Sequence, residues 1–253
     1  MWLLQGCISG GKAEVAPTYN GPLQASGVIL RSSEGLSVSP RETGTLGIQR
    51  ALIGVPATTP TNTGPIDIPV TGGIILGFCT NSKAHPLPTE TLFRVHPDYT
   101  DGWVNVTGTS QVGNRLQIAR KVGDAVETTE VGFEIDTEQQ STVSLINYYR
   151  SNAGTVSVIH DLFHNPTVGT EANVPFLGAQ VGDWAVIALS SQVPGINVST
   201  GGWIIDAFSR VDPTHSIHSN AFEAIHTLTV YRKKLTQSDI SEGFVSFSPI
   251  PYT

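Results

Sequence analysis

The chain has 253 residues, of which 14% are charged, with 26 glycines, 16 prolines and a formal net charge of −7. Many turn residues and few charges are typical of all-β chains rather than of chains with long helices. The 14 lysines and arginines form no basic stripe, which argues against nucleic acid as a partner. No apolar run approaches the roughly 20 residues of a membrane-spanning helix, so we expect no membrane insertion.

Residues 1–68 differ in composition from the rest, because short apolar groups alternate with Gly, Pro, Ser and Thr. Within residues 56–65, three prolines and four threonines disfavour both a helix and an interior strand. A segment with so few apolar residues often needs a neighbouring surface to become ordered. Residues 1–68 are therefore predicted to be an extended N-terminal arm and linker that contacts other subunits. The alternative is a few strands folded onto the main domain.

From residue 69 onward the chain contains short runs rich in β-branched and aromatic residues, which predict strands. Several alternate with period two, which predicts one face in a core and one in solvent. Residues 236–242 have the capping chemistry of a short helix. The predicted strands cover residues 73–79, 115–119, 142–149, 155–159, 184–189 and 227–231.

Four landmarks recur in the same order in the two halves of residues 69–253. They are the glycine-led apolar strands 72–79 and 182–189, the dipeptides Gly102-Trp103 and Gly202-Trp203, the basic-ended strands 115–121 and 227–233, and the segments 130–133 and 241–244. This order predicts one antiparallel β-sandwich domain, jelly-roll-like, whose two pseudo-repeated halves form its two facing sheets. The alternative is that any two antiparallel sheets share such landmarks.

The Gly-Trp dipeptides, the basic pair at 120–121, Trp184 and the closing segment 244–248 resemble a β-sandwich module of phage virion proteins. That module occurs in tail, fibre and head-surface components and in some bacterial surface proteins. The resemblance covers residues 69–253. It implies a structural or adhesive role without enzymatic activity, and it carries over no catalytic residue.

Glu134, Asp136 and Glu138 form a competing pattern, because residues i, i+2 and i+4 of a strand share one face. A retaining glycosidase needs two carboxyl groups about 5–5.5 Å apart. The segment resembles the Glu-x-Asp-x-Glu signature of laminarinase-like jelly-roll glycosidases. That resemblance implies a nucleophile at Glu134, an electrostatic helper at Asp136 and an acid/base at Glu138. The alternative is an exposed acidic strand face.

Two histidine pairs have spacings that could bind a metal ion. His160 and His164 have the spacing of a zinc-protease motif, but residues 155–159 predict a strand where that motif requires a helix. His215 and His218 lie in a polar segment, where an exposed histidine pair is the simpler interpretation. We therefore expect no metal site and no cofactor.

Trp103 and Trp203 allow two interpretations. Indoles at loop edges can stack on sugars, whereas large aromatic residues beside turn glycines often close the end of a β-sandwich core. We favour the second interpretation and keep glycan contact as an alternative.

The sequence thus predicts a non-enzymatic structural protein of a phage-like virion, located on the extracellular particle at head or tail. Its partners would be other virion subunits, contacted through residues 1–68, in a homo-oligomer or a larger assembly. The alternatives are a glycan-binding adhesion or receptor-binding module and a laminarinase-like glycoside hydrolase.

Overall fold

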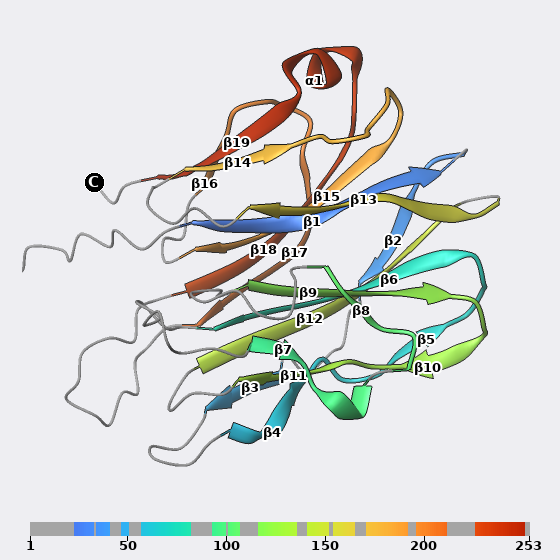
Figure 1. The fold of residues 1–253 in the computed structure, drawn as a ribbon, viewed down its shortest axis with the longest axis vertical. Coiled ribbons are helices and arrows are strands. Elements are labelled where there is room, and N and C mark those ends of the chain that lie inside the picture. Colours follow the sequence, from blue (N-terminus) through green and yellow to red (C-terminus); the bar gives the residue numbers. More distant parts are fainter. Residues whose placement is uncertain are drawn as a thin grey trace, which may run out of the picture.

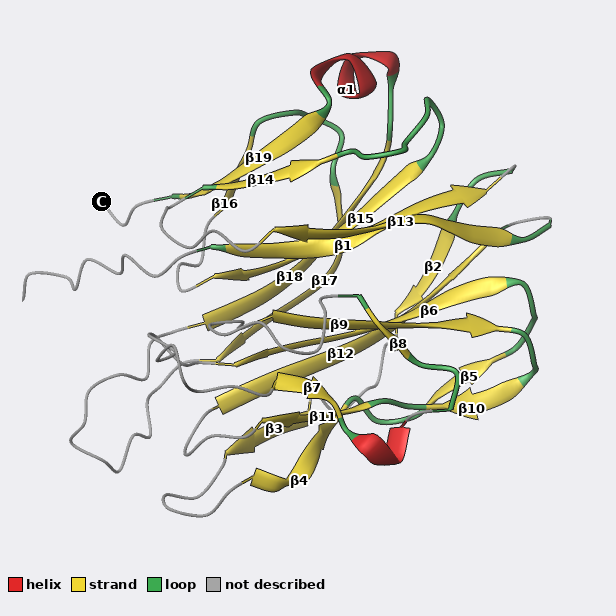
Figure 2. Cartoon of the chain, in the orientation of Figure 1, coloured by secondary structure: helices red, strands yellow, loops and turns green. Residues whose placement is uncertain are grey.

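The computed structural model describes residues 23–32, 34–40, 47–50, 57–81, 93–99, 101–106, 116–135, 141–151, 154–164, 171–191, 196–211 and 226–250. Antiparallel strands make up nearly all of this part of the chain (Figure 2), which confirms the all-β prediction. Helix is confined there to the 3-10 turn η1 (Pro97–Tyr99) and the helix α1 (Gln237–Glu242). No helix of the described part is long and apolar enough to cross a membrane.

Two large sheets form the centre of the molecule (Figure 1). Sheet I has the strand order β13 (Val156–His164), β1 (Gln24–Ser32), β15 (Trp184–Ser191), β18 (His226–Lys234) and β17 (Ile204–Val211). Sheet II has the order β2 (Ser37–Pro40), β12 (Ser141–Arg150), β6 (Gly73–Asn81), β9 (Leu116–Gly123) and β8 (Val104–Asn105), and β3 (Gly47–Arg50) also pairs with β12. The sheets face each other, because one buried apolar cluster joins side chains of both, including Val28, Val186, Leu76, Phe78 and Ile118. A jelly-roll description remains a prediction.

Smaller sheets cover the outer faces of the two large ones (Figure 1). Over sheet I lies a first cover sheet of β14 (Ala172–Pro175), β19 (Phe244–Pro249) and β16 (Ile196–Val198), joined to it by a second apolar cluster. Over sheet II lie a second cover sheet of β4 (Ala57–Asn62), β11 (Gly132–Ile135) and β7 (Phe93–Val95), and a ribbon of β5 (Ile66–Ile68) and β10 (Glu127–Thr129).

The cover sheets explain why the central strands β6 and β15 are apolar on both sides. Every described side chain of β6, and every residue of β15 after Trp184, is buried. These two strands therefore do not follow the period-two pattern that is predicted for several of the strands. A continuous apolar run, rather than an alternating one, is typical of a strand buried on both faces.

The predicted N-terminal arm is wrong for the described part of residues 1–68. Strand β1 lies inside sheet I, hydrogen-bonded to β13 on one side and to β15 on the other. Its residues from Gln24 to Leu30 are all buried. Strands β2 and β3 pair with β12, and β4 pairs with β11. The alternative of strands folded onto the main domain is therefore the observed arrangement. Residues 1–22 lie outside the described residues.

The predicted linker is also a strand. Most of residues 56–65 belong to β4, which lies at the edge of the second cover sheet beside β11. An edge strand needs hydrogen bonds on one side only, so it can hold Pro60, which cannot donate to a ladder. The low apolar content of this segment therefore reflects an edge position rather than a connection between domains.

The predicted strands after residue 69 are confirmed as β6, β9, β12, β13, β15 and β18. The predicted helix start is confirmed as well. The side chain of Thr236 caps α1 and that of Asp239 bonds back to the backbone of Thr236, which completes a capping box.

Candidate functional site

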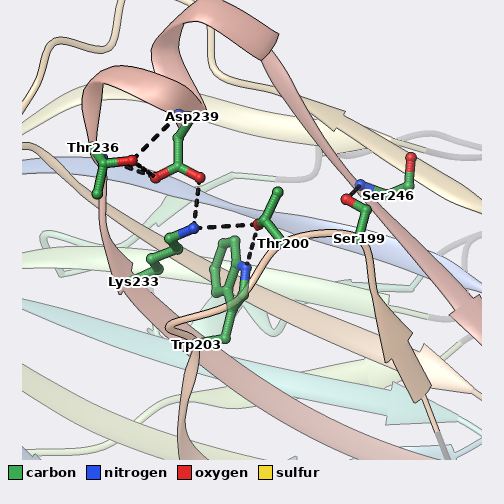
Figure 3. Close-up of polar contacts among 7 residues, drawn as sticks. All are labelled: Ser199, Thr200, Trp203, Lys233, Thr236, Asp239 and Ser246. Carbon is green, nitrogen blue, oxygen red and sulfur yellow. Dashed lines mark hydrogen bonds and ion pairs between the residues drawn. The ribbon is translucent and has the colours of Figure 1, made fainter.

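The turn that contains Trp203 and the start of α1 together form the most complete polar cluster of the described residues. We call it the Trp203 corner, and it consists of Thr200, Trp203, Lys233, Thr236 and Asp239 (Figure 3). Trp203 follows Gly202, whose backbone has a φ of +84°. Only glycine adopts this left-handed conformation at little cost, so Gly202 lets the chain turn sharply into β17.

A buried ion pair lies at the centre of the Trp203 corner. The Nζ of Lys233 lies 2.5 Å from Oδ1 of Asp239. Oδ2 of Asp239 accepts hydrogen bonds from the backbone N of Thr236 at 2.8 Å and from its hydroxyl at 2.7 Å. Burial alone would raise the pKa of Asp239, but the bonds from Lys233 and Thr236 and the charge of Lys233 lower it below its ordinary value. The carboxylate is therefore ionised and satisfied on both oxygens.

Trp203 is held by contacts on its polar edge and on its ring. Its Nε1 donates to Oγ1 of Thr200 at 3.1 Å, and the Nζ of Lys233 donates to the same oxygen at 3.3 Å. The ring meets Phe247 and Tyr231 edge to face, with centroids 5.6 and 6.4 Å apart. Lys233 Nζ lies 5.9 Å from the indole centroid. These contacts place the indole against the cluster between sheet I and its cover sheet.

A second corner surrounds Trp103 on sheet II. We call Gly102, Trp103, Lys121 and Glu127 the Trp103 corner. Gly102 has a φ of +71°, and the Nζ of Lys121 lies 2.8 Å from Oε1 of Glu127. Trp103 packs against the two apolar clusters between sheet II and its covering strands. Gly77 makes room for this packing, because a Cβ there would lie 3.6 Å from the Trp103 ring and 2.4 Å from Val131.

The chemistry of the Trp203 corner favours a structural role. A hydroxyl beside a lysine can act as an activated nucleophile only if the amine is neutral and can accept a proton. Lys233 instead donates to the ionised carboxylate of Asp239 and to the hydroxyl of Thr200. The cluster thus fixes the positions of Trp203, α1 and the end of β18 relative to one another.

A further polar network lies between the two large sheets. A bulge in β17, between Ile205 and Ala207, turns the carboxylate of Asp206 inward. Asp206 accepts from the hydroxyl of Tyr149 at 3.1 Å and from Nε of Arg232 at 3.2 Å. Burial raises the pKa of Asp206, and Arg232 and Tyr149 offset only part of that rise. The pKa of Tyr149 is raised well above its usual range, mainly by burial and secondly by the charge of Asp206.

The predicted carboxylate row is only partly within the described residues. Glu134 lies on β11 opposite Arg94 of β7. Asp136 and Glu138 lie outside the described residues, so the glycosidase geometry remains a prediction.

The structure describes one of the two histidine pairs. His160 and His164 lie on strand β13, so the helix that a zinc-protease motif needs is not formed there, as the sequence predicted. Asp161, between them, pairs with Arg120 at 3.0 Å. His215 and His218 lie outside the described residues. Among the described residues no group of three or more His, Cys, Asp or Glu could hold a metal ion.

Sequence reasoning singled out both tryptophans but missed the ion pairs beside them. The structure places both indoles against buried clusters, which is the arrangement expected of core plugs. One signal could have placed Asp239 near Lys233, because a capping box predicts that the carboxylate at N3 turns back to the N-cap residue, here Thr236, which follows two residues after the end of β18. No family model, no curated protein and no solved structure matches this chain.

Proposed function

We propose that this chain is a non-enzymatic structural protein of a phage-like particle, in which a neighbouring subunit covers the outer edge of sheet I. The observation that carries this proposal is strand β17. Strand β17 forms one edge of sheet I, because among the described strands it pairs with β18 alone. Its apolar residues Ile204, Ile205 and Phe208 are 51%, 58% and 50% exposed.

The composition of this edge is unusual for a surface that faces water. Edge strands are commonly protected by exposed charges, which prevent pairing with another chain. Asp206 is the one ionisable residue of β17 whose side chain the structure describes, and that side chain is turned inward to Arg232 and only 1% exposed. Exposed apolar groups gathered on one element mark a surface for a protein partner. A subunit of a particle has permanent neighbours that can cover such a surface.

The corners support a structural role over glycan binding. A sugar platform needs an open aromatic face, whereas Trp203 meets Phe247, Tyr231 and Lys233. Residues 1–22 lie outside the described residues, so an arm formed by them remains part of the proposal.

The proposal is tested with particles produced from the genome that encodes the chain. We expect mass spectrometry to detect the chain in gradient-purified particles, and antibodies to label it on their surface. Phe208→Lys should abolish its incorporation without changing its circular dichroism or melting temperature as a free protein. Val126→Lys, which alters an exposed valine on the loop between β9 and β10, serves as the matched control and should be incorporated normally.

Two results would overturn parts of this proposal. If the unsubstituted chain is not in purified particles, the virion role is wrong. If Phe208→Lys is incorporated as efficiently as Val126→Lys, the edge of β17 is not the contact with the neighbouring subunit.

A further inference from the structure

We infer that the chain is an internal duplication, in which residues 23–135 and 141–250 are equivalent halves that exchange their first strands. Each half is then the obligate partner of the other, and the second half occupies the place of a second copy of the first. This inference does not depend on the proposed function.

The order of strands in the two large sheets carries the first step. Sheet II reads β2, β12, β6, β9, β8, and sheet I reads β13, β1, β15, β18, β17. If β6 corresponds to β15 and β9 to β18, the remaining strands also correspond, β12 to β1, β2 to β13 and β8 to β17. Every pair of neighbours in one sheet then has an equivalent pair in the other.

Equivalent residues contact each other at the centre of the molecule. Thr80 near the end of β6 and Ser190 near the end of β15 are 110 residues apart, and their buried hydroxyls hydrogen-bond to each other between the sheets. Two equivalent residues can touch in this way only near a two-fold axis, as in an isologous dimer interface. The pair therefore places a pseudo-two-fold axis between β6 and β15.

The turns that begin these two strands have the same geometry. Gly72 and Gly182 have φ values of +92° and +95°. The backbone N of Gly72 donates to the carbonyl of Gly123 at 2.8 Å, at the end of β9. The backbone N of Gly182 donates to the carbonyl of Leu235 at 2.9 Å, just after β18. A backbone hydrogen bond thus recurs between equivalent elements.

The two Arg-Lys pairs make equivalent contacts as well. Arg120 on β9 bonds to Asp161 on β13, which belongs to the second half, at 3.0 Å. Arg232 on β18 donates to the carbonyl of Leu36, just before β2 of the first half, at 2.6 Å. Each arginine therefore reaches across to the other half, and the lysine after it forms an ion pair with a carboxylate of its own half.

The cover sheets complete the correspondence. The second cover sheet reads β4, β11, β7, and the first reads β14, β19, β16. Asn62 pairs with Gly132 in the former, and Pro175 pairs with Phe244 in the latter. The halves differ where β10 carries Glu127, because helix α1 carries Asp239 at the corresponding place.

The exchange of first strands differs from the sequence expectation that each half forms one sheet. Strand β1 of the first half lies between β13 and β15 of the second. Strand β12 of the second half lies between β2 and β6 of the first. Neither half alone can complete its large sheet, because an interior strand would be missing and its neighbours would expose unpaired backbone groups and apolar faces.

The first test cuts the folded full chain between its halves. A recognition sequence for a site-specific protease is inserted between Glu138 and Gln139, and the folded protein is cleaved. We expect both fragments to elute together at the size of the intact chain and to separate only in denaturant. Separation without denaturant would overturn the inference. Should the insertion prevent folding, calorimetry of the unmodified chain decides, because one unfolding transition supports obligate halves and two independent transitions contradict them.

A second test addresses the equivalence itself. The double exchange Thr80→Ser with Ser190→Thr returns the same pair of hydroxyls across the axis, so we expect no shift in the denaturation midpoint. Thr80→Val alone leaves the buried hydroxyl of Ser190 without its partner and should lower the midpoint. If the double exchange lowers the midpoint as much as Thr80→Val does, the two positions are not equivalent.

Discussion

The Trp203 corner and the Trp103 corner contain the same kinds of side chain, but water reaches them to different extents. The side chains of Lys233 and Asp239 are 8% and 2% exposed, and those of Lys121 and Glu127 are 10% and 29% exposed. Asp239 sits at the start of a helix and receives two further bonds from Thr236. Glu127 lies on a short strand of the outer ribbon. The comparison predicts that the burial of the carboxylate, rather than that of the lysine, determines how much stability each corner loses when its ion pair is removed.

The largest expected effect comes from removing the lysines. Lys233→Met leaves Asp239 as an unpaired buried charge, which typically costs about 3–5 kcal/mol of unfolding free energy. Lys121→Met leaves Glu127 with a side chain that is 29% exposed, so it should cost less than Lys233→Met, because water can partly hydrate the unpaired charge. Denaturant titration of the two variants measures both losses. Equal losses would show that burial does not distinguish the corners.

The turn glycines should give smaller and more similar effects. Gly102→Ala and Gly202→Ala each force a side chain into the left-handed region, which costs about 1–2 kcal/mol. A Cβ at Gly102 would lie 3.3 Å from Cε of Lys121, and one at Gly202 3.6 Å from Cε of Lys233, so we expect the first substitution to cost slightly more.

Gly201→Ala provides the control for the turn substitutions. A Cβ there meets nothing within 4 Å, and Gly201 is not among the glycines with positive φ. Denaturation midpoints of the three variants compare them directly. A loss for Gly201→Ala as large as that for Gly202→Ala would remove the argument from backbone conformation.

The strands at the centre of the fold could be predicted from sequence because their chemistry is local. The run at 184–189 is apolar throughout, and its short length and its Val and Ile residues favour a buried strand over a buried helix segment. The capping box at Thr236 and Asp239 is local in the same way. These features were predicted within a few residues of their observed bounds.

The place of β1 could not be predicted, because it depends on partners far away in sequence. Its run Gln24–Ser32 contains Gln, Ala, two Ser and Gly, and it is buried because β13 and β15 flank it and both faces are covered. The close packing of β1 against β15 also requires glycine at position 27, since a Cβ there would lie 2.0 Å from the carbonyl oxygen of Val186. Composition alone therefore predicted an arm where the fold has an interior strand.

The ion pairs at the corners were missed for a related reason. Lys121 and Glu127, like Lys233 and Asp239, come from consecutive elements, and only the turn between those elements brings each charge pair together. The sequence displays the charges but not the turn geometry.

The smallest expected effect concerns pH, where two buried aspartates should differ in sign. The pKa of Asp239 lies below its ordinary value of 3.8, since bonds from Lys233 and Thr236 outweigh the effect of burial. Its contribution to stability is complete above pH 3.8 and is lost as pH falls through the lower folded pKa. For Asp206 burial dominates and the pKa is raised above 3.8, so its contribution is complete below pH 3.8 and is lost as pH rises through the folded pKa.

Carboxyl carbon chemical shifts, followed by NMR during an acid titration, measure both aspartates in one sample. Asp239→Asn and Asp206→Asn assign the two signals, and unfolding free energies of both variants between about pH 2 and 6 give the linked stability changes. In Asp239→Asn the acid-side loss of stability should shrink, because the group that must be protonated in the folded state is gone. The opposite order of the two midpoints would mean that Lys233 does not outweigh burial at the Trp203 corner. A larger loss of stability in Lys233→Met than in Lys121→Met would then come from packing of the Lys233 alkyl chain against Trp203 instead of from its charge.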